Sequence, residues 1–124
     1  MHNPRPLARP NLTFMRVPVA ATPVTIVALE RHPFSNQAFM PLDGTCHLVA
    51  VCPATHKGDP DLSELRVFEA SGAQAINYNA NVWHAPRTAL SAPGAFVMFR
   101  WDDGSAADTD TRSLKTPITV EFGR

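Results

Sequence analysis

The sequence predicts a small all-β barrel, and three observations support this fold class. Apolar and polar residues alternate at the two-residue period of a strand in several short segments, whereas few segments show the longer period of a helix. Twelve prolines interrupt the 124 residues, which favours short strands joined by tight turns. An apolar share of 44% is typical of a folded globular chain and argues against overall disorder.

Seven or so short segments carry the strand pattern, as in a barrel or sandwich. The turn at Asp43-Gly44 lies between two apolar runs and predicts a hairpin. Residues 61–65 suit one helical turn capped by Asp61 or Ser63, and residues 92–94 and 104–111 suit loops. The predicted strands are residues 24–30, 37–42, 45–52, 65–70, 75–78, 95–101 and 118–121.

The length predicts one domain over residues 1–124, with residues 1–11 as a loose N-terminal arm. That arm has no apolar run typical of a signal peptide, and no stretch reaches the roughly 18 apolar residues of a membrane span. A cytoplasmic location is therefore expected.

Charge narrows the class of partner. Lys plus Arg and Asp plus Glu are 11 each, so the formal net charge is zero. A chain without basic excess is poorly suited to nucleic acid or to an anionic membrane surface. A small neutral ligand or a single anion remains a suitable partner.

The two cysteines are expected to be free and buried. Cys46 and Cys52 lie in one predicted strand, where about 3.3 Å per residue separates them by roughly 20 Å. This separation is far beyond the reach of a disulfide. Small buried apolar packing is the usual role of such thiols.

The segment 30–44 resembles the first motif of cupins, which places His-x-His, then Glu, then Gly on two barrel strands. Glu30 and His32 occupy the histidine positions, Gln37 the glutamate position and Gly44 the glycine position. Residues 30 and 32 share one strand face by alternation. Each of these residues, taken alone, would more often be a solvated or turn residue, and only their joint spacing indicates a site.

Residues 78–84 resemble the second cupin motif, with His84 at its histidine. The resemblance implies a cupin-type barrel, also called a double-stranded β-helix or jelly roll, with residues 30, 32, 37 and 84 facing one cavity. If a divalent metal is bound, its expected ligands are Glu30, His32, Gln37 and His84. One carboxylate, two imidazoles and an amide suit such an ion only weakly.

Four runs sharpen the resemblance: residues 29–33, 37–41, 61–66 and 76–86 are similar, in order and spacing, to signatures of the ureidoglycolate lyase family. The resemblance covers roughly residues 24 to 104. It implies cleavage of (S)-ureidoglycolate to glyoxylate and urea in allantoin degradation, part of purine catabolism. It also implies a cupin-like homodimer, with a divalent metal in some members.

Three departures from the family pattern stand out. Asn79 occupies a position where the family commonly has histidine, and residues 100–104 replace a glycine-rich turn after the last core strand. The family also has a longer N-terminal region, and its absence is expected to affect the pocket or a dimer contact.

The lyase resemblance implies roles for individual residues. Breaking the carbon–nitrogen bond of the substrate requires a base and an acid, for which Glu30, His32 and His84 are the catalytic candidates. The substrate-binding candidates are Gln37 and Tyr78 for the ureido group and Arg87 for the carboxylate, while Trp83 forms core or cavity wall. Arg31 is a weaker candidate for the carboxylate, because alternation turns it away from Glu30.

Two other functions remain open. One is a non-catalytic cupin that binds a small carboxylic acid, and the other is a cupin enzyme, such as an isomerase or dioxygenase, that acts on a small oxoacid. The sequence lacks a two-histidine, one-carboxylate metal set at the usual spacing, which argues against a dioxygenase. Residues 46–52 are apolar on both strand faces, so a homodimer is expected to cover the outer face.

Overall fold

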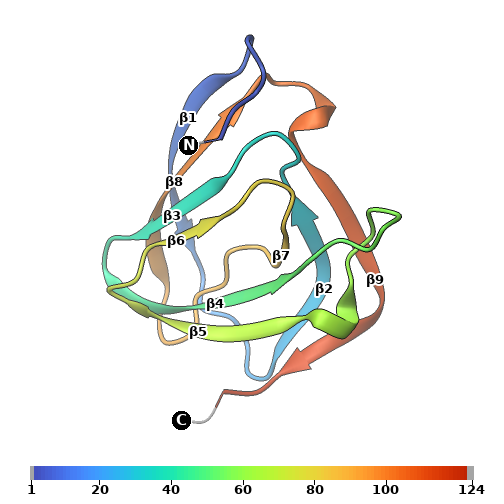
Figure 1. The fold of residues 1–124 in the computed structure, drawn as a ribbon. Helices are drawn as coiled ribbons and strands as arrows, with labels where there is room; N and C mark the ends of the chain where they lie inside the picture. The colour runs from blue at the N-terminus through green and yellow to red at the C-terminus, as the bar shows by residue number, and fades with distance from the viewer. Residues whose placement is uncertain (1, 123–124) are drawn as a thin grey trace.

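The structure is a computed structural model that describes residues 2–122, and it confirms the all-β fold class (Figure 1). Within that range there are nine strands and two short 3-10 helices. No helix among the described residues is both long enough and apolar enough to cross a lipid bilayer. The elements are β1 (Arg9–Val17), β2 (Val24–Arg31), β3 (Gln37–Pro41), β4 (Gly44–Cys52), η1 (Leu62–Glu64), β5 (Arg66–Gly72), β6 (Ile76–Tyr78), β7 (Trp83–His84), β8 (Gly94–Asp102), η2 (Ala106–Asp108) and β9 (Asp110–Val120).

The described strands form two antiparallel sheets that enclose the interior of the barrel. One sheet has the strand order β1-β8-β3-β6, and the other has the order β5-β4-β7-β2-β9. The longest pairings join strands that are far apart in sequence, β1 with β8 and β2 with β9. This arrangement is the two-sheet barrel that the alternation pattern predicts.

The hairpin predicted at Asp43-Gly44 is wrong. Strand β3 pairs with β6 and β8, whereas β4 pairs with β5 and β7, so the chain crosses here from one sheet to the other. The Asp43 carboxylate accepts a hydrogen bond from the Ala95 N–H at 3.0 Å, and Gly44 has a φ of +79°. An Asp-Gly turn, which often closes a hairpin, also suits a sharp crossing between two sheets. Here the segment that contains Ala95 holds the crossing in place.

The loose arm predicted for residues 1–11 is wrong where the structure describes it. Strand β1 begins at Arg9, and residues 9–11 pair with residues 100–102 of β8. Before the strand, Arg5 forms an ion pair with Asp108 at 2.7 Å. The single domain predicted over residues 1–124 stays a prediction, and its residues 1, 123 and 124 lie outside the described residues.

Two further differences concern the second half of the chain. Strand β9 begins at Asp110, inside the predicted loop, because Thr111 pairs with Glu30. Strand β7 has only two residues, too few for a periodic pattern to reveal. The predicted helical turn is confirmed as η1, with the Asp61 carboxylate accepting from the Ser63 N–H at 3.2 Å.

The five-stranded sheet is buried on both faces by the chain itself. Along β4, His47 and Val49 face the four-stranded sheet, whereas Leu48 and Ala50 face a second apolar layer on the other side. Partly buried residues of the chain, including Leu65, Leu114 and Ile118, pack against this second layer. The apolar outer face therefore needs no partner to cover it, and the sequence argument for a homodimer from this face is wrong.

The cysteines are free, as predicted: Cys52 is buried in the second apolar layer, and Cys46 is half-buried beside it.

The second apolar layer generates a stability prediction. Replacing Leu48, which is 1% exposed, with alanine should lower the free energy of unfolding by about 2–5 kcal/mol, because it removes buried methyl groups and leaves a cavity. Leu7→Ala is the matched control: Leu7 is 82% exposed, and its loss should cost less than about 0.5 kcal/mol. Urea unfolding followed by tryptophan fluorescence measures both, and equal losses would show that Leu48 lies in no core.

Candidate functional site

Two residues of the site come from the end of β2. Alternation turns Glu30 and His32 towards the barrel interior and Arg31 away from it, as predicted. Arg31 lies over the Trp83 ring, 4.7 Å from its centroid, and forms an ion pair with Asp110 at 3.0 Å. Glu30 is directly opposite His84 of β7 in the strand register, which brings their side chains together.

The other sheet contributes Gln37 and Tyr78, which are opposite each other on β3 and β6. Gln37 Oε1 lies 3.0 Å from His84 Nε2, so this contact joins the two sheets across the interior. The Tyr78 and His84 rings stack with centroids 4.1 Å apart and an interplanar angle of 8°. Asn81, at a φ of +69°, donates its backbone N–H to the His32 carbonyl at 2.9 Å and so connects the loops before β3 and β7.

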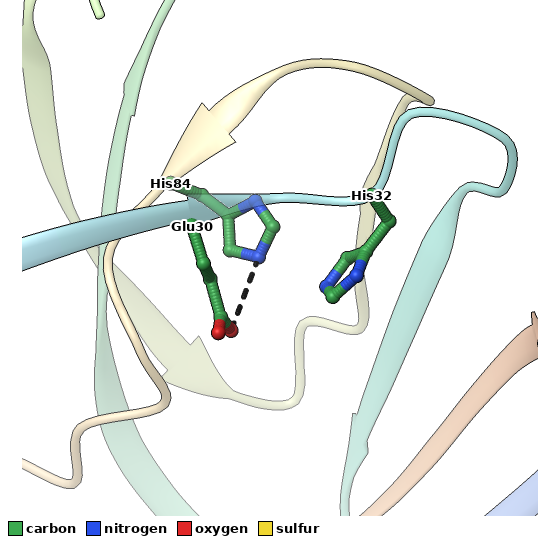
Figure 2. A group of neighbouring side chains, drawn as sticks. All are labelled: Glu30, His32 and His84. Carbon is green, nitrogen blue, oxygen red and sulfur yellow. Dashed lines mark ion pairs between the residues drawn. The ribbon is translucent and has the colours of Figure 1, made fainter. Parts of the chain in front are cut away.

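Figure 2 shows Glu30, His32 and His84 converging on one point. Their ligand atoms all lie within 4.8 Å of one another. Glu30 Oε1 is 3.6 Å from His84 Nε2, and the two imidazole rings are 5.4 Å apart between centroids. His32 and His84 are buried, whereas the side chain of Glu30 is 29% exposed and opens the group to solvent. The structure therefore brings together all four of the expected cupin positions.

Backbone carbonyls orient both histidine rings in the same way. The Nδ1–H of His84 donates to the Val82 carbonyl at 3.0 Å, and the Nδ1–H of His32 donates to the Asp108 carbonyl at 3.1 Å. A carbonyl can only accept, so Nδ1 carries a proton in each ring and Nε2 faces the interior. The Nε2 atom of His32 is buried and has no hydrogen-bond partner among the described residues.

The environment keeps Glu30 charged and His32 neutral. The hydrogen bond from His84 holds the pKa of the Glu30 carboxyl below its usual value, against the opposing effect of burial, so Glu30 is ionised at neutral pH. Burial lowers the pKa of His32, and the hydrogen bond to Asp108 only partly offsets this. The carboxylate of Glu30, which can accept a proton, thus lies beside two imidazoles. That of His32 is neutral, and that of His84 can donate a proton from Nε2 when this atom carries one.

Two predicted substrate-binding residues are placed differently from this group. Trp83 is fully buried in the second apolar layer, on the opposite sheet face from His84, and donates its Nε1–H to the Gly58 carbonyl at 3.1 Å. Trp83 is therefore a core residue, because alternation along β7 turns it to the opposite face from His84. Arg87 lies behind Tyr78, whose hydroxyl it contacts at 3.3 Å, with its guanidinium between the rings of Phe39 and Phe96.

Sequence reasoning missed Arg100. This residue is opposite Gln37 in the register of β8, and its Nη1 lies 3.5 Å from His32 Nδ1. Its Nε forms an ion pair with Asp102 at 2.7 Å. Alternation along β8 turns Phe99 and Trp101 outwards and Arg100 towards the interior. Only the pairing of β8 with β3, which places Arg100 opposite Gln37, reveals that this part of the interior is the site.

The family departure at Asn79 lies outside the group. Asn79 is exposed and lines an open surface hollow of about 500 Å³ together with Asn36 and Asn77. The change at this position leaves Glu30, His32 and His84 in contact.

The lowered pKa of His32 predicts a loss of stability below pH 6.5. In that range the unfolded chain binds a proton at residue 32 that the folded chain resists, so the free energy of unfolding falls as pH falls, by at most about 1.4 kcal/mol per pH unit. His32→Gln should make this slope shallower between pH 6.5 and 5. Part of the slope should remain, because burial also lowers the pKa of His47.

Urea unfolding at a series of pH values measures the slope. His56→Gln, at an exposed histidine, is the control for removing a histidine. An identical slope in wild-type protein and His32→Gln would contradict the buried neutral state of His32.

Comparisons with known proteins bear on the fold and on the family of the chain. RmlC from Streptococcus suis, a cupin solved in complex with dTDP-D-xylose, superposes with a TM-score of 0.53 over 80% of this chain and 46% of its own, at 15% identity. This likeness shows the cupin fold. A protein of Agrobacterium fabrum is 39% identical over 104 residues, which are 84% of this chain and 64% of that protein.

Two named relatives are similar to the same extent. The ureidoglycolate lyase of Schizosaccharomyces pombe is 38% identical over 77% of this chain and 52% of its own length. That of Salmonella paratyphi B is 38% identical over 85% of this chain and 63% of its own length. The chain thus spans about half to two thirds of the length of these curated relatives. The family model for ureidoglycolate lyase matches residues 2–121, and the chain belongs to the ureidoglycolate lyase family.

Proposed function

We propose that this protein cleaves (S)-ureidoglycolate to glyoxylate and urea, the reaction of allantoin degradation that its family name describes. The observation that carries the proposal is the ionised carboxylate of Glu30 beside the imidazoles of His32 and His84, in a chain of this family. The substrate is a small molecule with one negative charge. The guanidinium of Arg100 lies beside the site and suits such an anion, and the chain as a whole has zero formal net charge.

The reaction needs one proton removed and one supplied. Glu30 takes the proton of the substrate hydroxyl, and the electrons of that O–H bond form the carbonyl of glyoxylate. The carbon–nitrogen bond breaks, and its electron pair leaves on the urea nitrogen. His84, protonated at Nε2, gives that nitrogen its proton, so that charge and atoms balance. Each proton transfer by a placed side chain contributes around 10²–10⁴-fold to the rate.

Polar groups around the three residues suit the rest of the substrate. The Gln37 carboxamide and the Tyr78 ring, both in contact with His84, are placed for the ureido group. Arg100 is the better candidate for the substrate carboxylate than Arg87, because it lies beside His32, whereas Arg87 lies behind Tyr78. A guanidinium binds a carboxylate through two parallel hydrogen bonds, which also orients the substrate.

The same residues fit a divalent metal ion. Histidines that bind metals commonly donate the other ring N–H to a carbonyl, which is the arrangement of both His32 and His84. The ligand atoms would be Nε2 of His32, Nε2 of His84 and a carboxylate oxygen of Glu30, with Gln37 Oε1 as a fourth ligand. Among the described residues, Nε2 of His32 is buried and has no hydrogen-bond partner. A bound ion of the borderline class would polarise the substrate hydroxyl.

One observation favours a second candidate function. Glu30, His32 and His84 are two histidines and one carboxylate, the set whose absence from the usual spacing argued against a dioxygenase. The structure brings that set together from the end of β2, the residue after it and β7, so the sequence argument against a dioxygenase is wrong. A non-catalytic cupin that binds a small carboxylic acid is the further alternative.

The activity test uses two variants with opposite chemical losses. Glu30→Gln keeps the volume of the side chain and removes its charge, and His84→Ala removes the imidazole. Each should lower the turnover of (S)-ureidoglycolate by about 10²–10⁴-fold, and Glu30→Gln, which keeps the shape of the side chain, should do so without unfolding the chain. Urea and glyoxylate release are measured with and without a chelator, and His56→Ala is the control at an exposed histidine.

The outcomes separate the candidates. Full turnover in both variants would show that the site is elsewhere. No urea release by wild-type protein with any divalent ion supplied would reject the lyase, and oxygen uptake with small oxoacids would then favour the dioxygenase. Loss of wild-type activity on chelation would favour the metal-bound form.

The assembly and location belong to the same proposal. We propose a homodimer that uses the outer face of the four-stranded sheet, where Leu12 pairs with Phe99 and Phe14 with Val97, and where Leu12 and Phe14 are 69% and 56% exposed. A cytoplasmic location suits the free thiols of Cys46 and Cys52.

Light scattering at micromolar concentration should return twice the chain mass for the wild-type protein. Phe14→Glu, a charge placed on that face, should return the chain mass. A monomeric wild-type protein would rule out the dimer.

A further inference from the structure

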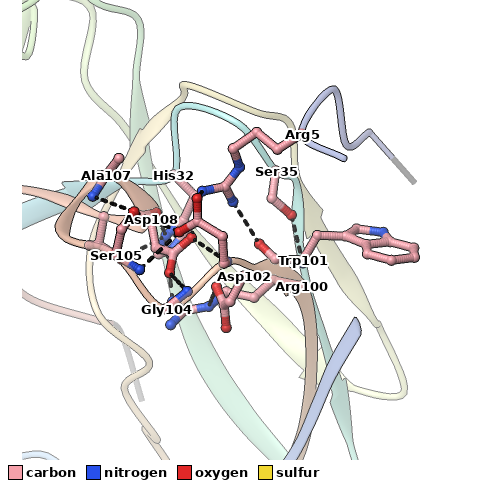
Figure 3. A network of polar contacts seen from close by, with 12 residues as sticks. Arg5, His32, Ser35, Arg100, Trp101, Asp102, Gly104, Ser105, Ala107 and Asp108 are labelled. Carbon is pink, nitrogen blue, oxygen red and sulfur yellow. Dashed lines mark hydrogen bonds and ion pairs between the residues drawn. The ribbon is translucent and has the colours of Figure 1, made fainter. Parts of the chain in front are cut away.

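The segment before β1 is attached to the loop between β8 and β9 through Arg5. Its Nη1 lies 2.7 Å from Asp108 Oδ1 and 3.2 Å from Asp103 Oδ2, and its Nη2 donates to the Trp101 carbonyl at 3.2 Å (Figure 3). The guanidinium also lies over the Phe34 ring, 5.1 Å from the centroid. The side chain of Arg5 is only 14% exposed, so this attachment is well ordered by its surroundings rather than a loose surface ion pair.

Asp108 is the residue through which this attachment reaches the site. Its carboxylate accepts the backbone N–H groups of Asp103 at 3.0 Å and Gly104 at 2.8 Å, and so closes the loop on itself. Its backbone carbonyl accepts the Nδ1–H of His32 at 3.1 Å, and the neighbouring Thr109 hydroxyl lies at the same distance from that nitrogen. One residue thus binds Arg5 with its side chain and His32 with its main chain.

The charges explain why Arg5 matters for the loop. The Asp103 and Asp108 carboxylates both lie against one guanidinium, which neutralises the repulsion between them. Without that cation the two like charges favour a more open loop. The carbonyl of Asp108 would move with it, and His32 Nδ1 would keep only the Thr109 hydroxyl. A hydroxyl donates as well as accepts, so by itself it selects neither the Nδ1–H tautomer nor the direction of Nε2.

We propose that Arg5 is a positioning residue for His32: by holding Asp103 and Asp108 together, it keeps the Asp108 carbonyl where it orients the imidazole towards Glu30. The effect on turnover rests on the proposed function, whereas the effect on the His32 ring does not. The N-terminal segment is in this way part of the support of the site.

The test compares Arg5→Ala, Arg5→Lys and the control Arg16→Ala, which removes an exposed arginine from β1. The ring nitrogens of ¹⁵N-labelled protein report the tautomer of His32 directly by NMR. Wild-type protein and Arg16→Ala should show a single Nδ1–H form, whereas Arg5→Ala should show mixed or exchange-broadened His32 signals. Lysine carries the same charge without the planar fork, so Arg5→Lys should restore the single form in part.

Kinetics supply the second readout. Loss of the group that orients a functional histidine commonly lowers activity by about 10–100-fold, so the turnover of Arg5→Ala should fall by a factor within this range. The change in KM should be smaller, and Arg5→Lys should regain part of the turnover.

Unchanged His32 ring signals in Arg5→Ala would overturn the proposal, whatever the activity. Changes spread over all resonances, which indicate general unfolding, would overturn it as well. If wild-type protein releases no urea, the proposed function fails, and the ring signals still decide the role of Arg5.

Discussion

The imidazole of His84 is the group on which the arrangement of the site depends. It lies on a two-residue strand at the centre of one sheet, contacts Gln37 of the other sheet, and stacks on Tyr78. A buried imidazole is costly unless its nitrogens have partners, and here Val82 accepts from Nδ1 while oxygens of Gln37 and Glu30 face Nε2. The hydrogen bonds of this ring hold β7 in place and join the two sheets through polar groups in an otherwise apolar interior.

Burial then distributes charge among groups that touch. The hydrogen bond from His84 keeps Glu30 charged against the effect of its own burial, whereas burial keeps His32 neutral. Both groups are thereby deprotonated at neutral pH, one charged and one neutral, so this pair contains a base but no acid. These states depend on the hydrogen bond from His84 to Glu30 and on the burial of His32, so substitutions in the surrounding core will act on the chemistry as well as on stability.

Much of the fold and the centre of the site could be predicted from local sequence. Alternation placed Glu30 and His32 on one face and turned Arg31 away, and motif spacing joined them to Gln37 and His84. The failures at the turn and at two arginines are non-local. Asp43-Gly44 has the composition of a hairpin, yet Ala95, more than fifty residues later, holds it as a crossing. Arg100 and Arg5 owe their positions to pairing between β8, β3 and β1, which no single segment of sequence encodes.

The order of the strands has a consequence for how the chain acquires its structure. Among the described strands only β4 and β5 are both consecutive and paired, whereas β1 pairs with β8, and β2 pairs with β7 and β9. On a ribosome, the first two strands therefore emerge long before their partners exist. Loop closure over such separations is entropically costly, and topologies of this kind fold in milliseconds to seconds rather than microseconds. Leu12 and Phe14 of β1, which are exposed even in the folded chain, are apolar side chains that emerge before any strand is available to pair with β1.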